Sequence, residues 1–292
     1  NWVWPLWIEE QWQPLSRAFI PTGAGLLGAN LSRRNWTSLG HSASPLECMV
    51  DPVGMVTVEP HSWSLLPYLK CSEGLQAPPY MGRVVKQKLC DGVLPIVTSE
   101  YPSIHGLEWS STSAATFIDG ALRITCRIDV LNTSSSAVQL VLGFGVRPYN
   151  VLSIGHINHL EHLGELLRVN RHWDVEYLET PSRVLMGDRG TGDPMKQPLV
   201  QNAPNDMRVM RARSGISAAS VEYDRALAAG EKCSIGIVIW CDAEKGKTKR
   251  KKVRRPRLHV GADALIRARE EELRLEDLRA VRIKLPDEKM EQ

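Results

Sequence analysis

A long succession of short apolar segments constrains the fold of this chain more than any other feature. Between residues 45 and 240, short runs rich in Val, Ile, Leu and Thr are separated by Gly, Pro, Asn and Asp. Runs of this length, bounded by turn-forming residues, are typical of β-strands, and Asp119 followed by Gly120 predicts a tight hairpin turn. More than ten such runs favour two large antiparallel sheets packed face to face. We therefore expect a mainly β protein, a large antiparallel β-sandwich (super-sandwich), over residues 45–244.

The segment before the predicted sandwich, residues 1–44, is rich in tryptophan. Pro5 disfavours a helix through its first turns. We expect an irregular N-terminal arm packed on the sandwich, because burial of so many large aromatic side chains stabilises the fold. The alternative is that these tryptophans stack on sugar rings. The tryptophans are Trp2, Trp4, Trp7, Trp12 and Trp36.

The C-terminal segment, residues 258–292, is charged and favours helix. Its apolar residues form an imperfect stripe at helical spacing, and Pro286 should end the regular part. We expect a helical linker here. The residues of the stripe are Ala262, Leu265, Ile266, Leu273 and Leu278.

A basic run separates the predicted sandwich from this helix. Residues 245–257 carry nine basic residues and no acidic ones, so removing them from the formal net charge of +3 leaves −6 for the remainder. We interpret the run as a solvated loop, and polyanion binding is the alternative. No aromatic residue is interleaved with the charges, which makes nucleic acid an unexpected partner. The candidate polyanion-binding residues are Lys249, Arg250, Lys251, Lys252, Arg254 and Arg255.

The cysteines and the longest apolar runs indicate the setting of the protein. The six cysteines contain no CxxC pair, and in a chain of this length they are expected to be free structural thiols, which favours the cytoplasm. The longest apolar runs are too short to cross a bilayer as helices, so no membrane association is expected. The first residues lack the pattern of an export signal.

The segment GFGVRPYN, residues 143–150, is the strongest candidate for recognition. It ends a predicted strand, and Pro148 stiffens the backbone around it. We expect Arg147, Tyr149 and Asn150 to be displayed on a partner or substrate surface. Arg147→Ala should then cost about 1 kcal/mol or less. If Arg147 is instead buried and paired with a carboxylate, the same substitution should unfold the domain.

Several segments, in the same order along the chain, carry a family resemblance. They are the RPYN element at 147–150, the Ile- and Leu-containing segment 154–160, the dipeptide Val169–Asn170, the GDxxxGDP-like turn 187–194, the opening NWVWPLWIEEQWQPLSRAFIP, LSRRNWTSLG and VDPVGMVTV. Together they resemble the N-terminal β-sandwich domain of six-hairpin glycosidase-like proteins, bacterial relatives of the amylo-alpha-1,6-glucosidase group. The basic run near residue 250 departs from that pattern. Asn35 and Trp36, within LSRRNWTSLG, are further candidates for a substrate or domain interface.

The resemblance implies a role in carbohydrate metabolism without a catalytic residue in this chain. Glycoside hydrolysis needs two carboxylates about 5 to 10 Å apart, and in the resembling proteins these come from a helical (α/α)6 toroid. The chain stops at Gln292, where the first hairpin of that toroid would be expected. The implied partner is therefore a helical catalytic domain of the same protein or of another chain, and no cofactor is expected.

Three regularly spaced histidines raise the hypothesis of a metal site, but the geometry of a helix or a strand argues against it. On a helix the spacing scatters His156, His159 and His162 around the axis, and on a strand His159 points opposite to the other two. We expect ordinary hydrogen-bonding histidines and no metal.

Two functions remain open from the sequence. The first is a noncatalytic β-sandwich module of a glycoside hydrolase-like protein, which supports or docks a helical catalytic domain. The second is an independent carbohydrate-binding or scaffolding protein that uses an exposed aromatic patch.

Overall fold

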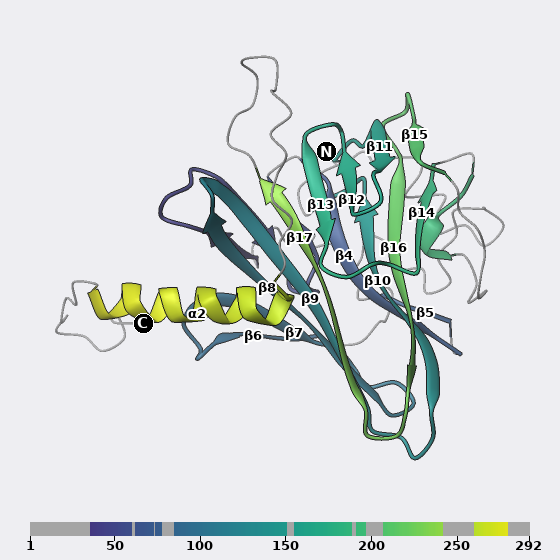
Figure 1. Cartoon of the computed structure of the whole chain (residues 1–292), viewed down its shortest axis with the longest axis horizontal. Coiled ribbons are helices and arrows are strands. Elements are labelled where there is room, and N and C mark those ends of the chain that lie inside the picture. The colour runs from purple at the N-terminus through teal and green to yellow at the C-terminus, as the bar shows by residue number, and fades with distance from the viewer. Residues whose placement is uncertain are drawn as a thin grey trace, which may run out of the picture.

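Two antiparallel sheets, packed face to face, make up most of the molecule (Figure 1). The computed structural model describes residues 36–59, 62–72, 74–77, 85–150, 155–188, 191–196, 207–241 and 260–279. Besides the strands, these ranges contain the 3-10 helix η2, Pro194–Lys196, and the helix α2, Ala262–Arg279. The mainly β, two-sheet sandwich predicted from the sequence is confirmed.

The first sheet has eight strands in the order β1-β2-β3-β4-β10-β16-β14, with β5 paired to β4. The order shows that strands distant in sequence become neighbours, since β10 lies between β4 and β16. The strands are β1 Thr37–Gly40, β2 Glu47–Val50, β3 Val56–Thr57, β4 Ser64–Cys71, β5 Gly74–Gln76, β10 Val138–Arg147, β14 Arg183–Gly187 and β16 Ala218–Leu227.

The second sheet has nine strands in the order β15-β11-β12-β13-β17-β9-β8-β7-β6. The strands are β6 Lys86–Cys90, β7 Leu94–Glu100, β8 Leu107–Ile118, β9 Ala121–Asn132, β11 His159–His162, β12 Leu166–Val169, β13 Trp173–Tyr177, β15 Val209–Arg211 and β17 Lys232–Cys241.

The main core lies between the two sheets. Alternate residues of each strand point inward, so that Phe144 and Val146 of β10 share one apolar cluster with Ile237 and Ile239 of β17. Four of the six thiols, including Cys126 in this cluster, are buried, and none of the six forms a disulfide. The expectation of free structural thiols is thereby confirmed.

The turns follow the sequence signals. Asp119 and Gly120 both have positive φ angles, 51° and 75°, and they join the two longest strands, β8 and β9. Two positive φ angles in a two-residue loop match the twist of the strands that flank it. The predicted hairpin is confirmed.

The two glycines of GFGV provide room for side chains above the first sheet. A Cβ at Gly145 would lie 2.5 Å from Sδ of Met195, and one at Gly143 would overlap the ring of Tyr68. Glycine in a strand interior often marks such a close approach. The outer face of β10 is therefore covered by neighbouring side chains.

Helix α2 docks on the outer face of the second sheet (Figure 1). Leu265, Ile266 and Leu273 are buried against β7, β8 and β17. Gly236 lets the first turn approach, since a Cβ there would lie 2.5 Å from that of Ala262. The side chain of Leu278, the last residue of the predicted stripe, lies outside the described residues.

The structure describes only part of the predicted N-terminal arm and C-terminal segments. Strand β1 pairs with β2, so the first sheet begins at Thr37, before the expected boundary at residue 45. Residues 1–35 and the basic run 245–257 lie outside the described residues. Within the described part, no helix combines the length and the apolar character needed to cross a bilayer.

Candidate functional site

The end of β10 holds its polar side chains in the interior rather than on the surface. Arg147, Tyr149 and Asn150 are 1%, 3% and 3% exposed. The Asn150 amide donates a hydrogen bond to the carbonyl of Ser62 at 2.6 Å. The expectation that this strand end displays the three side chains is wrong, because segments distant in sequence fold over it. A contribution of the three to an interface stays a prediction.

Arg147 forms a buried, bidentate ion pair with Asp193. Its Nη1 and Nη2 atoms donate to the two carboxylate oxygens at 2.6 and 2.7 Å. Burial by itself would raise the pKa of Asp193, but the charge of Arg147, its hydrogen bonds and the Met195 amide bring that pKa below its ordinary value. This is the structural arrangement that the sequence left open as the alternative.

The structure places two of the predicted residues in one apolar cluster. Half-buried Trp36 packs against a group that includes Tyr149, Tyr68 and Met195, on the outer side of the first sheet. Asn35 lies outside the described residues, as do the six candidate polyanion-binding residues, Lys249, Arg250, Lys251, Lys252, Arg254 and Arg255. Among the described residues, the large hydrophobic side chains that are exposed are all aliphatic. The aromatic patch of the alternative function is not found on the described surface.

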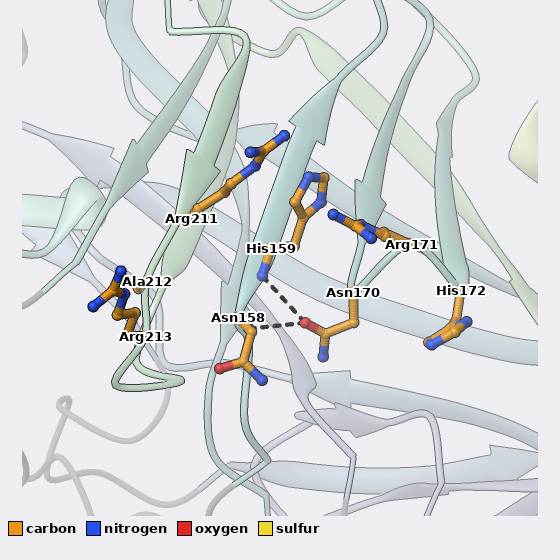
Figure 2. A pocket seen from close by; sticks show the side chains of 8 residues that line it. All are labelled: Asn158, His159, Asn170, Arg171, His172, Arg211, Ala212 and Arg213. Carbon is orange, nitrogen blue, oxygen red and sulfur yellow. Dashed lines mark hydrogen bonds between the residues drawn. The ribbon is translucent and has the colours of Figure 1, made fainter.

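A hollow of about 510 Å³ lies at one end of the second sheet, where β11, β12, β13 and β15 meet (Figure 2). It is open to solvent. Its lining combines amide, imidazole and guanidinium groups, and none of the described residues that line it is acidic. They are Asn158, His159, Asn170, Arg171, His172, Arg211, Ala212 and Arg213. We call this hollow the arginine pocket.

Asn170 builds the floor of the arginine pocket. Its side-chain oxygen accepts hydrogen bonds from the backbone amides of Asn158 and His159, at 2.8 and 3.3 Å (Figure 2), and its Nδ2 donates to the carbonyl of His156 at 2.7 Å. These bonds join the start of β11 to the β12–β13 hairpin. An amide is needed for this, because the position uses both an acceptor and a donor.

The β12–β13 turn sets the position of Arg171. Asn170 and Arg171 both have positive φ angles, 50° and 61°, and His172 closes the turn by donating to the Val169 carbonyl at 3.0 Å. Asparagine tolerates this conformation, whereas a long side chain such as arginine adopts it rarely. The hydrogen bonds of the Asn170 side chain, which we call the Asn170 clamp, fix the turn and so hold Arg171 in this conformation beside the pocket.

His159 lies between two of the arginines. It pairs with Arg211 in the β11–β15 register, and Figure 2 shows its ring between the side chains of Arg211 and Arg171. The residue is 9% exposed, and its Nδ1 has no hydrogen-bond partner among the described residues. Burial, together with the positive charges of Arg171 and Arg211, lowers the pKa of His159. These effects favour the neutral form of the ring.

Sequence reasoning did not find the arginine pocket. From the sequence, His159 is expected to be an ordinary hydrogen-bonding histidine rather than a metal ligand, and Asn170 enters only as part of the dipeptide Val169–Asn170. A local signal existed, because Arg211 and Arg213 alternate with buried Ala212 and so share the outer side of the chain. The sequence does not indicate that residues 211–213 lie beside residues 158–159 and 170–172, which come much earlier in the chain.

The histidine series and two carboxylate clusters bear on metal binding. His159 lines the arginine pocket, whereas Nδ1 of His162 lies 3.2 Å from the Tyr177 hydroxyl on the core side of the sheet. The two residues do not converge, as expected. Two other groups bring possible ligand atoms within 4.8 Å of one another, but in each an arginine of α2 already pairs with the carboxylates. These groups are His41, Glu272 and Glu276 beside Arg269, and Cys90, Asp91 and Glu270 beside Arg274.

Comparison with known proteins yields distant structural likenesses. No family model matches the chain, and no curated protein matches it either. Among solved structures, the chain is similar to a polysaccharide lyase, with a TM-score of 0.37 and 11% sequence identity. The likeness covers 72% of this chain and 33% of the lyase, so this chain spans about a third of that protein's length.

Proposed function

We propose that this chain is a noncatalytic, carbohydrate-binding β-sandwich module of a glycoside hydrolase-like protein, which supports a helical catalytic domain. The arginine pocket is the observation that carries the proposal. It is open, it has the volume of a small-ligand site, and its polar groups converge from three segments. Amide, imidazole and guanidinium groups supply directed hydrogen bonds to sugar oxygens.

The chemistry of the pocket suits binding better than hydrolysis. Glycoside hydrolysis uses two carboxyl groups that flank the scissile bond, and the described lining of the pocket offers none. Arg147 would have a positioning role in this proposal. Its ion pair holds Asp193 and the adjoining helix η2 in place, on the side of the sandwich that also carries Trp36 and Tyr149.

Binding and turnover can be measured on the same preparation. We expect affinity electrophoresis in gels that contain glycans to show retardation by at least one of them, and a panel of aryl glycosides and α-glucans to show no hydrolysis. Asn158→Ala, which removes an exposed amide of the pocket, should weaken retardation. Gln139→Ala, which removes an exposed amide of β10, should not.

Two results would contradict the proposal. If no glycan retards the protein in the gel, the chain does not bind carbohydrate as proposed. Turnover that survives repurification, and that disappears when one Glu or Asp of this chain is replaced, would show that the chain is itself catalytic.

A further inference from the structure

Two arginines of the arginine pocket, Arg211 and Arg213, differ from most other described arginines of the sandwich. Most described arginines pair with a carboxylate within the chain, as Arg168 does with Asp174 and Arg183 does with Glu222. Arg211 and Arg213 are exposed, and neither forms an ion pair with a described carboxylate. Together with Arg171 they concentrate positive charge around a lining without acidic groups. Such a site attracts anions.

His159 is the second feature of the site. Its ring lines the pocket and lies between the guanidinium groups of Arg171 and Arg211 (Figure 2). Protein atoms shield its Nδ1 from solvent, so a ligand in the open pocket would meet the guanidinium groups rather than this nitrogen. The positive charge on either side of the ring indicates an anionic ligand.

We propose that the arginine pocket binds the anionic substituent, a carboxylate or a sulfate, of an acidic glycan. This inference rests on the carbohydrate-binding role proposed above and names its ligand class. The planar fork of a guanidinium matches two oxygens of a carboxylate or a sulfate. The exposed amide of Asn158 lies in the same lining and suits the hydroxyl groups of the sugar ring.

The lining favours a glycan over a single-stranded nucleic acid. Binding of unpaired bases relies on aromatic platforms, and the described lining includes no Trp, Tyr or Phe. Charge alone would not discriminate between these ligands, so the test compares a carboxylated glycan, a sulfated glycan, a neutral glycan and a nucleic acid.

The experiment titrates the whole chain by calorimetry, at 0.15 M salt, with polygalacturonate, dextran sulfate, dextran and an oligothymidylate. We expect at least one of the two acidic polymers to bind at least tenfold more tightly than dextran or the oligothymidylate. Polygalacturonate as the tighter ligand would assign a carboxylate, and dextran sulfate would assign a sulfate.

Variants assign the binding to the pocket. The double variant Arg211→Ala, Arg213→Ala should weaken binding of the acidic glycan at least tenfold. The matched control, Arg267→Ala with Arg274→Ala on α2, removes the same charge from exposed positions and should change affinity less than twofold. Arg211→Lys with Arg213→Lys keeps the charge but removes the fork, and should show an intermediate loss.

Each contrary result has a distinct meaning. Equal losses in the pocket variant and its control would overturn the inference, because binding would then follow total charge. Equal affinity for dextran and the acidic polymers would overturn it while the carbohydrate-binding proposal stands. Tight binding of the oligothymidylate alone would indicate a nucleic-acid site and refute both the acidic-glycan inference and the carbohydrate-binding proposal. Binding of none of the polymers would also refute both.

Discussion

Replacing Arg147 by alanine tests whether this residue stabilises the fold. The side chains of Arg147 and Asp193 are 2% and 6% exposed, and two short hydrogen bonds join the guanidinium to the carboxylate. Removing Arg147 leaves the carboxylate buried without its cation. Breaking a buried ion pair in this way costs about 3–5 kcal/mol. We therefore expect Arg147→Ala to lower the free energy of unfolding at pH 7 by about that amount.

The effect should depend on pH with a defined sign. In the wild type the pKa of Asp193 is lowered, so the pair stabilises the protein above the unfolded pKa, and this contribution is lost as the pH falls through the folded pKa. In Arg147→Ala, protonation of Asp193 removes the buried charge. The difference in stability between wild type and variant should therefore narrow as the pH falls from 7 towards about 4.

Urea unfolding followed by tryptophan fluorescence measures these free energies. Arg213→Ala, an exposed arginine without a described carboxylate partner, is the control and should change stability by about 0.5 kcal/mol or less. Asp193→Ala and the double variant complete a cycle, in which the double variant should cost clearly less than the two single losses added together. A cost of about 1 kcal/mol or less for Arg147→Ala, the value expected of a surface residue, would refute the structural role.

Three further predictions concern other parts of the fold. Burial raises the pKa of Asp51 to about 7, so the contribution of Asp51 to stability is complete below its unfolded pKa and is lost as the pH rises through about 7. Asp51→Asn should make the free energy of unfolding, measured by urea titration, fall less steeply between pH 4 and 8. The same pH dependence in variant and wild type would contradict this prediction. Asn170→Ala should cost about 1–2 kcal/mol, because it leaves backbone amides of the pocket unpaired, and an unchanged melting temperature would argue against the clamp. Gly143→Ala should cost about 1–3 kcal/mol, because Tyr68 hydrogen-bonds Glu222 at 2.7 Å and cannot move aside freely; calorimetric melting measures this loss, and wild-type stability would show that the ring yields.

The strands and turns could be predicted because their signals are local. Short apolar runs bounded by turn residues indicate many of the strands, although not β1, β4 or β15. Asp119 with Gly120 defines a turn through the backbone conformations that these two residues tolerate. The same holds for α2, in which the described residues of the apolar stripe are all buried, although the stripe does not indicate the burial of Arg269. These features depend on neighbours within a few positions in the chain.

The environment of a polar side chain could not be predicted in this way. Arg147 was expected on the surface, since nothing near it in sequence indicates its partner, and Asp193 follows 46 positions later. The glycines at 143 and 145 show the same dependence, because the side chains above them come from β4 and η2. The requirement for glycine at these two positions comes from contacts between segments that are distant in the chain.

The sequence by itself determined that this chain forms two β-sheets, since hydrophobic periodicity and turn chemistry act over a few residues. Only the tertiary structure decided which charges are buried in pairs and which converge on an open pocket. Arg147 and Arg211 both lie at the end of a strand, yet one is buried against Asp193 and the other is exposed beside His159. The physical reason is that the burial and charge partners of a side chain depend on how the sheets bring distant segments together.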